Sequence, residues 1–157
     1  VFRIVFDPDA SLRGIENGDV IMGALHFEFD DGAFPLPGPG WVDRVHPNVG
    51  LWIDQVRRLV DGDIAHAFVR FDEGPFGVFF EPLSETEVQY RCVYGGARQH
   101  PQFFSGPFAE VVDELGRVSA LVDRACADNG FVCAPTAPRA AELRRRFEWN
   151  GAKLRLA

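Results

Sequence analysis

The sequence predicts an α+β fold in which an antiparallel sheet of about five strands packs against two main helices. Residues 64–94 hold three segments of alternating apolar and polar side chains separated by two tight turns, which is typical of a three-stranded antiparallel meander. Residues 2–6 and 20–30 have the pattern of two further strands, which we expect to pair as a hairpin. Two other segments repeat their apolar residues at helical spacing, so helices are expected to cover the sheet. A short C-terminal helix completes the predicted fold.

The length and composition indicate one globular domain. The chain has 157 residues, of which 46% are hydrophobic and 25% charged, as is typical of a single domain spanning residues 1–157. No segment approaches the roughly 18 to 20 consecutive apolar residues of a membrane span, and the N-terminus has no basic region followed by an apolar stretch. We therefore expect a cytoplasmic protein that does not bind membranes.

In the N-terminal half, the second predicted strand, residues 20–30, has the clearer alternation. Its apolar side chains at every second position fall on one face, so the strand is expected to be half-buried. The loop that follows, up to Trp41, is rich in proline and glycine, which prevents regular structure. Its large apolar side chains are expected to pack against the sheet edge or the next helix. That helix is predicted over residues 49–60, with Asn48 as its cap.

The alternation within the meander assigns its side chains to faces. His66 and Arg70 share one face of the first strand. The middle strand, residues 76–83, is apolar on both faces, so we expect it to lie in the core. In the third strand, Tyr90 faces one way, and Arg91 faces the other way, towards solvent.

The C-terminal part is predicted to be helical. Residues 95–104 are expected to form a loop, and Ser105 to cap the longest helix, which ends at Gly130. A last helix is expected over residues 138–147. Because it carries few apolar residues, we expect residues 135–157 to be a loosely docked C-terminal segment.

The sequence contains none of the common catalytic motifs. It has no GxSxG elbow, no phosphate-binding loop, no HExxH and no dinucleotide-binding glycine pattern. The triplet His26-Phe27-Glu28 matches half of the zinc-deaminase signature, but the PCxxC half is missing. The three cysteines have no CxxC spacing and the four histidines are dispersed, so neither a disulfide framework nor a metal site is indicated. We therefore predict a protein that is not an enzyme and has no cofactor or metal.

Charge is distributed unevenly along the chain, whose net charge is −7. Residues 1–90 hold 16 acidic and 6 basic side chains, whereas residues 91–157 hold 7 acidic and 10 basic ones. An acidic surface repels nucleic acid and attracts basic proteins. The basic run at residues 139–146 is expected to be a solvated helix face or an intramolecular partner of the acidic half.

Two stretches of the middle of the chain resemble a known group of proteins. They are the loop FPLPGPGWVD, residues 34–43, which leads into a Trp-containing helix, and the turn FDEGPFG, residues 71–77. Over residues 25–94 the chain resembles small bacterial proteins that look like immunity proteins of polymorphic or contact-dependent toxin systems. Such proteins bind a toxin and block its active site, so the resemblance implies a protein partner and no catalytic residues. An acidic surface would suit a basic toxin domain.

These observations leave three functional hypotheses open. The first is a non-catalytic, immunity-type binding protein that contacts its partner through acidic turns and the Trp loop. Its candidate contacts are Asp30, Asp31, Trp41, Asp43, Asp72 and Glu73. The second is a small-molecule-binding or enzymatic domain with a Phe-lined pocket between sheet and helices. The polar groups of that pocket would be His66, Arg70, Tyr90 and Arg91. The third is a structural or oligomerising domain that uses an exposed sheet edge.

Overall fold

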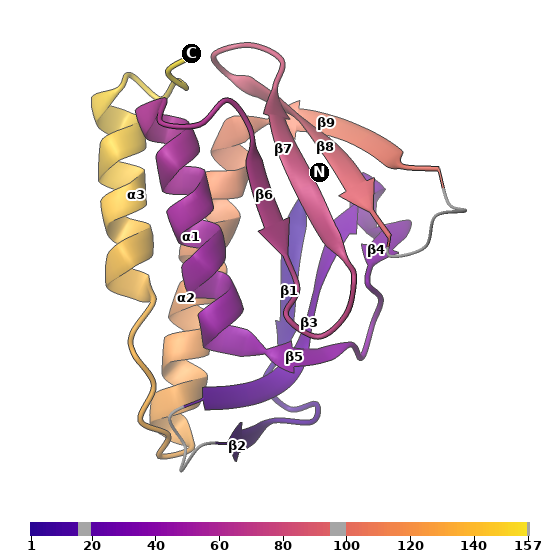
Figure 1. Cartoon of the computed structure of the whole chain (residues 1–157). Coiled ribbons are helices and arrows are strands. Elements are labelled where there is room, and N and C mark those ends of the chain that lie inside the picture. The colour runs from indigo at the N-terminus through magenta and orange to yellow at the C-terminus, as the bar shows by residue number, and fades with distance from the viewer. Residues whose placement is uncertain (16–19, 95–99, 157) are drawn as a thin grey trace.

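The computed structural model describes residues 1–15, 20–94 and 100–156 (Figure 1). These residues form three helices and two antiparallel sheets of five and four strands, so the predicted α+β class is confirmed. The expected hairpin strands and the expected meander belong to separate sheets rather than to one. None of the described helices is long and apolar enough to cross a membrane.

The first sheet is built around one long strand. It contains β1 (Arg3–Asp7), β2 (Arg13–Ile15), β3 (Val20–Phe29), β4 (Phe34–Leu36) and β5 (Val42–Arg44). The pairing of β1 with β3 is antiparallel, as predicted for the hairpin, and brings Ile4 opposite Phe27. Because β3 pairs along both edges, with β1 and β2 and with β4 and β5, most of its residues are buried.

The second sheet contains the predicted meander and one additional strand. Its order is β6 (Ala67–Arg70), β7 (Gly77–Pro82), β8 (Glu87–Val93) and β9 (Gln102–Pro107). The sequence predicts a loop and a helix cap where β9 lies. Instead, β9 pairs with β8 along its length and places Ser105 opposite Gln89, so Ser105 is a strand residue and not a cap. An available strand edge outweighs the weak local pattern of this segment.

The middle strand β7 is buried on one face only. Val78 and Phe80 lie in the core, whereas Phe79 on the opposite face is partly exposed. The prediction that both faces of this strand are core is therefore wrong. None of the three helices in the described part of the chain covers the outer face, so the apolar side chains there meet solvent.

The helices are α1 (Val45–Asp61), α2 (Phe108–Asp128) and α3 (Ala137–Trp149). The first begins earlier than predicted, because Pro47 fits the first helical turn, where its missing N–H is not needed. Asn48 is consequently a buried residue inside the helix rather than its cap. The predicted end at Gly130 is confirmed. Gly130 and Gly62, the residue that follows α1, both have a positive φ.

The three helices run side by side along one side of the sheets (Figure 1). The outermost helix, α3, packs on α1 and α2 through buried Ala140, Leu143 and Phe147. The Phe147 ring lies 5.5 Å from the ring of Phe108 in α2. Three apolar residues at one helical face are thus enough to hold α3 against its neighbours.

An aromatic core joins the two sheets to the helices. The ring of Phe2, next to β1, lies 5.7 Å from that of Phe80 in the second sheet. Trp52 of α1 lies 4.6 Å from Phe27 of β3, and its indole N–H donates a 2.7 Å hydrogen bond to the carbonyl oxygen of Arg70. The core therefore fixes the inner face of the second sheet and leaves its outer face free to serve as a surface.

Candidate functional site

A row of side chains crosses all four strands on the outer face of the second sheet. Side chains alternate between the two faces of a strand, so residues in register on neighbouring strands share a face. Phe68 is opposite Phe79, Phe79 is opposite Arg91, and Arg91 is opposite Phe103. We call these four residues the outer row.

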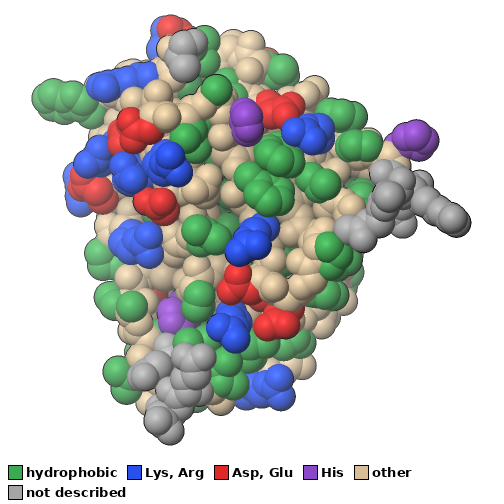
Figure 2. Space-filling view, viewed as in Figure 1, with side chains coloured by type: hydrophobic (Ala, Val, Ile, Leu, Met, Phe, Trp, Pro, Cys, Tyr) green, Lys and Arg blue, Asp and Glu red, His purple; other side chains and the backbone are tan. Residues whose placement is uncertain are grey.

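Three members of the outer row, Phe68, Phe79 and Arg91, pack against one another. The rings of Phe68 and Phe79 are stacked, with centroids 4.4 Å apart and an interplanar angle of 24°. The guanidinium carbon of Arg91 lies 4.1 Å from the Phe79 ring centroid, and its Nε–H donates to Glu81 at 3.0 Å. Phe68 and Phe103 are nevertheless 37% and 53% exposed. Figure 2 shows hydrophobic side chains gathered over β6 and β7 in the middle of this face, with charged side chains around them.

Gly77 makes the stacking of this row possible. A Cβ atom at this position would lie 2.6 Å from Cε2 of Phe68, which is closer than carbon atoms can approach. The ring of Phe68 therefore occupies the space above the Gly77 backbone, and the glycine fixes where that ring lies.

Acidic side chains border the outer face at the turn between β6 and β7. Asp72 and Glu73 are both exposed in this turn, two and three residues after Arg70. Glu73 faces Arg44 at 3.8 Å, and both side chains are about half exposed. On the same face, the ring of His66 lies 5.7 Å from that of Phe79. The predicted acidic turn thus lies at one end of the strand pair that carries Phe68 and Phe79, with Arg70 between the turn and Phe68 along β6.

Asp43, a predicted contact residue, is an internal support of this turn. It is completely buried, so it cannot touch a partner. Its carboxylate accepts hydrogen bonds from the Trp41 indole N–H at 3.0 Å, the Arg44 backbone N–H at 2.7 Å and the Glu73 backbone N–H at 3.1 Å. Trp41 is half-buried, with its ring 5.0 Å from that of Phe76. The Trp loop therefore holds the acidic turn in place.

The other predicted acidic contacts, Asp30 and Asp31, lie in a different part of the molecule. They form the short 3-10 helix η2 (Asp30–Gly32) at the end of β3, where both are exposed and have φ near +50°. The neighbouring Phe29 and Phe34 pack into the first sheet and against the second. Asp30 and Asp31 are accessible, but they extend from the first sheet and not from the outer row.

The four residues predicted to line a pocket do not converge. His66, Arg70 and Arg91 lie on the outer face of the second sheet, whereas Tyr90 lies on the inner face and is 1% exposed. Burial, and secondarily the charge of Glu110, raises the pKa of the Tyr90 phenol well above its usual range. Tyr90 is therefore a core residue, and the other three belong to an open surface.

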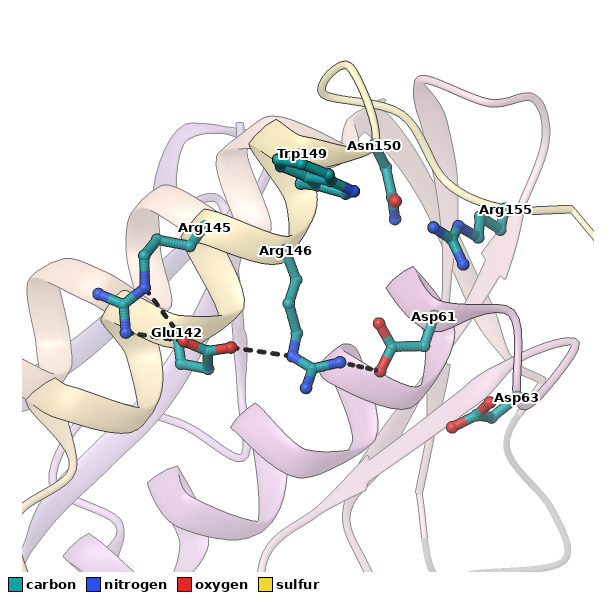
Figure 3. Close-up of a pocket in the computed structure, with 8 residues that line it drawn as sticks. All are labelled: Asp61, Asp63, Glu142, Arg145, Arg146, Trp149, Asn150 and Arg155. Atoms are coloured by element: carbon teal, nitrogen blue, oxygen red, sulfur yellow. Dashed lines mark hydrogen bonds and ion pairs between the residues drawn. The ribbon is translucent and has the colours of Figure 1, made fainter.

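A groove of about 450 Å³ lies between the C-terminal ends of α1 and α3 (Figure 3). It is lined by Asp61, Asp63, Glu142, Arg145, Arg146, Trp149, Asn150 and Arg155. Arg146 bridges Asp61 at 2.9 Å and Glu142 at 3.2 Å, so these carboxylates are already bound to an arginine. Exposed ion pairs of this kind each contribute little to stability, and here they connect α3 to α1. Such a charge-compensated groove offers neither a paired acid and base nor a free carboxylate cluster.

The outer row lacks the ligands needed to hold a metal or a cofactor. Within the described ranges, the single group of side chains close enough together for a metal ion is His46, Cys126 and Cys133, where α1, α2 and the loop after α2 meet. The outer row can therefore recognise a surface, but its chemistry does not suggest a reaction.

Comparison with known proteins gives no match to a family model, to a curated protein or to a solved structure. The function is therefore inferred from the chain's own geometry and charge.

The sequence identifies most members of the outer face but not their association. The alternation places Arg91 on a wet face and groups His66 with Arg70, and both assignments agree with the structure. Phe103 is missed because its strand β9 is not predicted. The stack of Phe68 on Phe79 could have been found from the meander register alone, had the middle strand been assigned one exposed face.

Proposed function

We propose that this chain is a non-catalytic binding protein that neutralises a basic protein partner, in the manner of an immunity protein of a toxin system. The observation that carries the proposal is the outer row, in which Phe68 is stacked on Phe79, Arg91 lies over Phe79, and Phe103 is exposed on the neighbouring strand. In this proposal the partner lies against the outer row, and its basic groups face the Asp72-Glu73 turn. A cytoplasmic location is part of the proposal.

The chemistry of the outer row supports protein binding. Aromatic and arginine side chains provide most of the binding energy in protein interfaces, and they are most effective near the centre of a flat contact area. Phe68 and Phe79 are already stacked, and Arg91 is held by Glu81, so few side-chain rotamers would be lost on binding. A flat face of this kind suits a protein surface better than it suits a small molecule.

The charge of the chain supports a basic partner. With a net charge of −7, the protein attracts basic proteins over distances of about one Debye length, about 8 Å at physiological salt. Asp43 holds the turn that carries the exposed carboxylates of Asp72 and Glu73, which lies at one end of the strands β6 and β7 that carry Phe68 and Phe79. These carboxylates would therefore orient a basic partner towards the aromatic residues and raise the association rate.

The test uses the product of the gene immediately upstream, which the proposal expects to contain a toxin domain. Its affinity for the purified chain is measured by calorimetry over a range of salt concentrations. Phe79→Ala should weaken binding by roughly thirtyfold, the effect of losing a contact of about 2 kcal/mol. The double variant Asp72→Lys, Glu73→Lys should slow association and remove most of the salt dependence.

Trp149→Ala is the matched control for the aromatic substitution. Trp149 is 87% exposed but lies on α3 and is not part of the outer row, so its removal should change the affinity less than twofold. The proposal fails if the upstream product is not a toxin or does not bind. It also fails if Trp149→Ala weakens binding as much as Phe79→Ala does.

A further inference from the structure

Two cysteines and a histidine that are distant in the sequence meet at one end of the helices. His46 lies in the first turn of α1, Cys126 in the last turn of α2, and Cys133 in the loop before α3. Their nearest ligand atoms all lie within 4.8 Å of one another. The two sulfur atoms are 2.6 Å apart, which is inside their van der Waals contact distance. Two sulfur donors and one nitrogen donor thus lie close enough together to share one metal ion.

The end of α2 brings Cys133 back to Cys126. Gly130, with φ at +69°, turns the chain, and the Phe131 N–H donates to the carbonyl oxygen of Cys126 at 2.9 Å. The Gly130 N–H donates to Ala127 at 3.2 Å, which completes a Schellman motif. The chain after the turn therefore runs back past the last turn of α2.

The other end of this loop is also anchored. The Asp123 carboxylate, one turn before Cys126, accepts the backbone N–H of Thr136 and that of Ala137, both at 2.8 Å. Cys133 is therefore held between two fixed points, the turn at Gly130 and the cap of α3. A donor held in this way needs little reorganisation to bind an ion.

The donor set selects the kind of ion. Thiolate sulfur and imidazole nitrogen are ligands of Zn²⁺ and related soft cations, whereas Ca²⁺ and Mg²⁺ require oxygen donors. The two negative charges of two thiolates would balance the two positive charges of Zn²⁺, and the imidazole would be neutral, so the bound site would carry no net charge and could be buried. The C-terminal end of α2 adds a partial negative charge that favours a cation.

We propose that His46, Cys126 and Cys133 form a Zn²⁺ site with water in the fourth position. Each thiol releases its proton to solvent on binding, and the imidazole binds through its unprotonated ring nitrogen. Sulfur atoms bound to one tetrahedral Zn²⁺ at about 2.3 Å lie about 3.8 Å apart, so the sulfurs separate by about 1 Å. Cys133, which lies on a loop and is partly exposed, allows this movement and provides the entry route. The ion would clamp α1 to α2 and to the loop before α3.

The experiment measures Zn²⁺ and Co²⁺ binding by the full chain purified under reducing conditions. After loading with Zn²⁺ and desalting, wild type should retain one ion per chain. Co²⁺ added alone should give the visible absorption of a tetrahedral ion and a thiolate-to-cobalt charge-transfer band in the near ultraviolet. Zn²⁺ should also raise the thermal unfolding midpoint, because it binds only the folded state.

Cys133→Ser should lose the bound ion, the charge-transfer band and the Zn²⁺-dependent rise in the midpoint. Since Cys133 is in a loop, this variant should keep the far-ultraviolet circular dichroism of wild type. His46→Gln is a second variant, for which at least a tenfold loss of affinity is expected. Cys92→Ala is the control, because Cys92 is a buried thiol in β8, outside the cluster, and its removal should leave metal binding unchanged.

Three results would overturn the proposal. The first is a reduced wild-type chain that retains no Zn²⁺. The second is a Co²⁺ spectrum that Cys133→Ser leaves unaltered. The third is a disulfide between Cys126 and Cys133 that persists under reducing conditions, because that bond would leave neither sulfur available as a thiolate ligand.

Discussion

The buried carboxylate of Asp43 is the support on which the acidic turn depends, and Asp43→Ala tests this directly. The substitution removes the acceptor of three hydrogen bonds, from the Trp41 indole N–H and from the backbone N–H groups of Arg44 and Glu73. Hydrogen bonds to a charged group each contribute about 1.5 to 3 kcal/mol. Some of the released donors can reach water at the surface, so the full sum is not lost. We expect the free energy of unfolding to fall by about 3 to 5 kcal/mol, because each buried donor left without an acceptor costs about 1 to 3 kcal/mol.

Urea denaturation followed by tryptophan fluorescence measures this loss. A fall of this size is a large fraction of the roughly 5 to 15 kcal/mol that stabilises an ordinary domain, so the midpoint should move far to lower urea. Asp128→Ala is the matched control, because Asp128 is an exposed aspartate in the last turn of α2, and its removal should change stability by less than about 1 kcal/mol. If the two variants were equally stable, Asp43 would not be the support described here.

Two further predictions concern the second sheet. Gly77→Ala should push the Phe68 ring off Phe79 and lower the free energy of unfolding, measured by urea denaturation, by about 1 to 2 kcal/mol. Gly106→Ala is the control, because its Cβ would meet no atom closer than 3.5 Å and should cause no such loss. Equal losses of stability in the two variants would contradict this prediction. Burial raises the pKa of the Cys92 thiol from its ordinary value of 9.0 to about 12. As pH rises, the unfolded chain loses this proton before the folded chain does, so the free energy of unfolding should fall between about pH 9 and about pH 12. In Cys92→Ala the free energy of unfolding, measured by denaturation at a series of pH values, should fall less steeply over this range.

The sequence is sufficient to predict the meander and the long helix because each has a strong local signal. Alternation through the meander assigns Tyr90 and Arg91 to opposite faces, and the structure agrees. The stop at Gly130 is equally clear, since only glycine readily adopts the positive φ of a Schellman turn. In both cases the deciding interaction lies within a few residues of the pattern that predicts it.

The remaining features depend on contacts between distant segments. The strand β9 forms because the edge of β8 is available to pair, and neither strand contains this information alone. The meeting of Cys126 with Cys133 follows from the turn after α2, but His46 reaches them from α1, 80 residues earlier in the chain. Likewise, the sequence predicts Asp43 as an exposed contact, because its burial arises only when the turn of the second sheet folds over the first.

The corrected roles of Trp41 and Asp43 change how substitutions near the acidic turn must be interpreted. Replacing either residue would release the turn that carries Asp72 and Glu73, so partner binding would weaken although neither replaced side chain need touch the partner. Loss of binding alone therefore cannot distinguish a contact residue from a support. Stability separates them: Asp43→Ala should lower both the affinity and the free energy of unfolding, whereas the exposed Asp72→Lys, Glu73→Lys variant should lower the affinity and leave unfolding nearly unchanged. A residue is assigned to the interface when its substitution changes the affinity for the partner and leaves the free energy of unfolding unchanged.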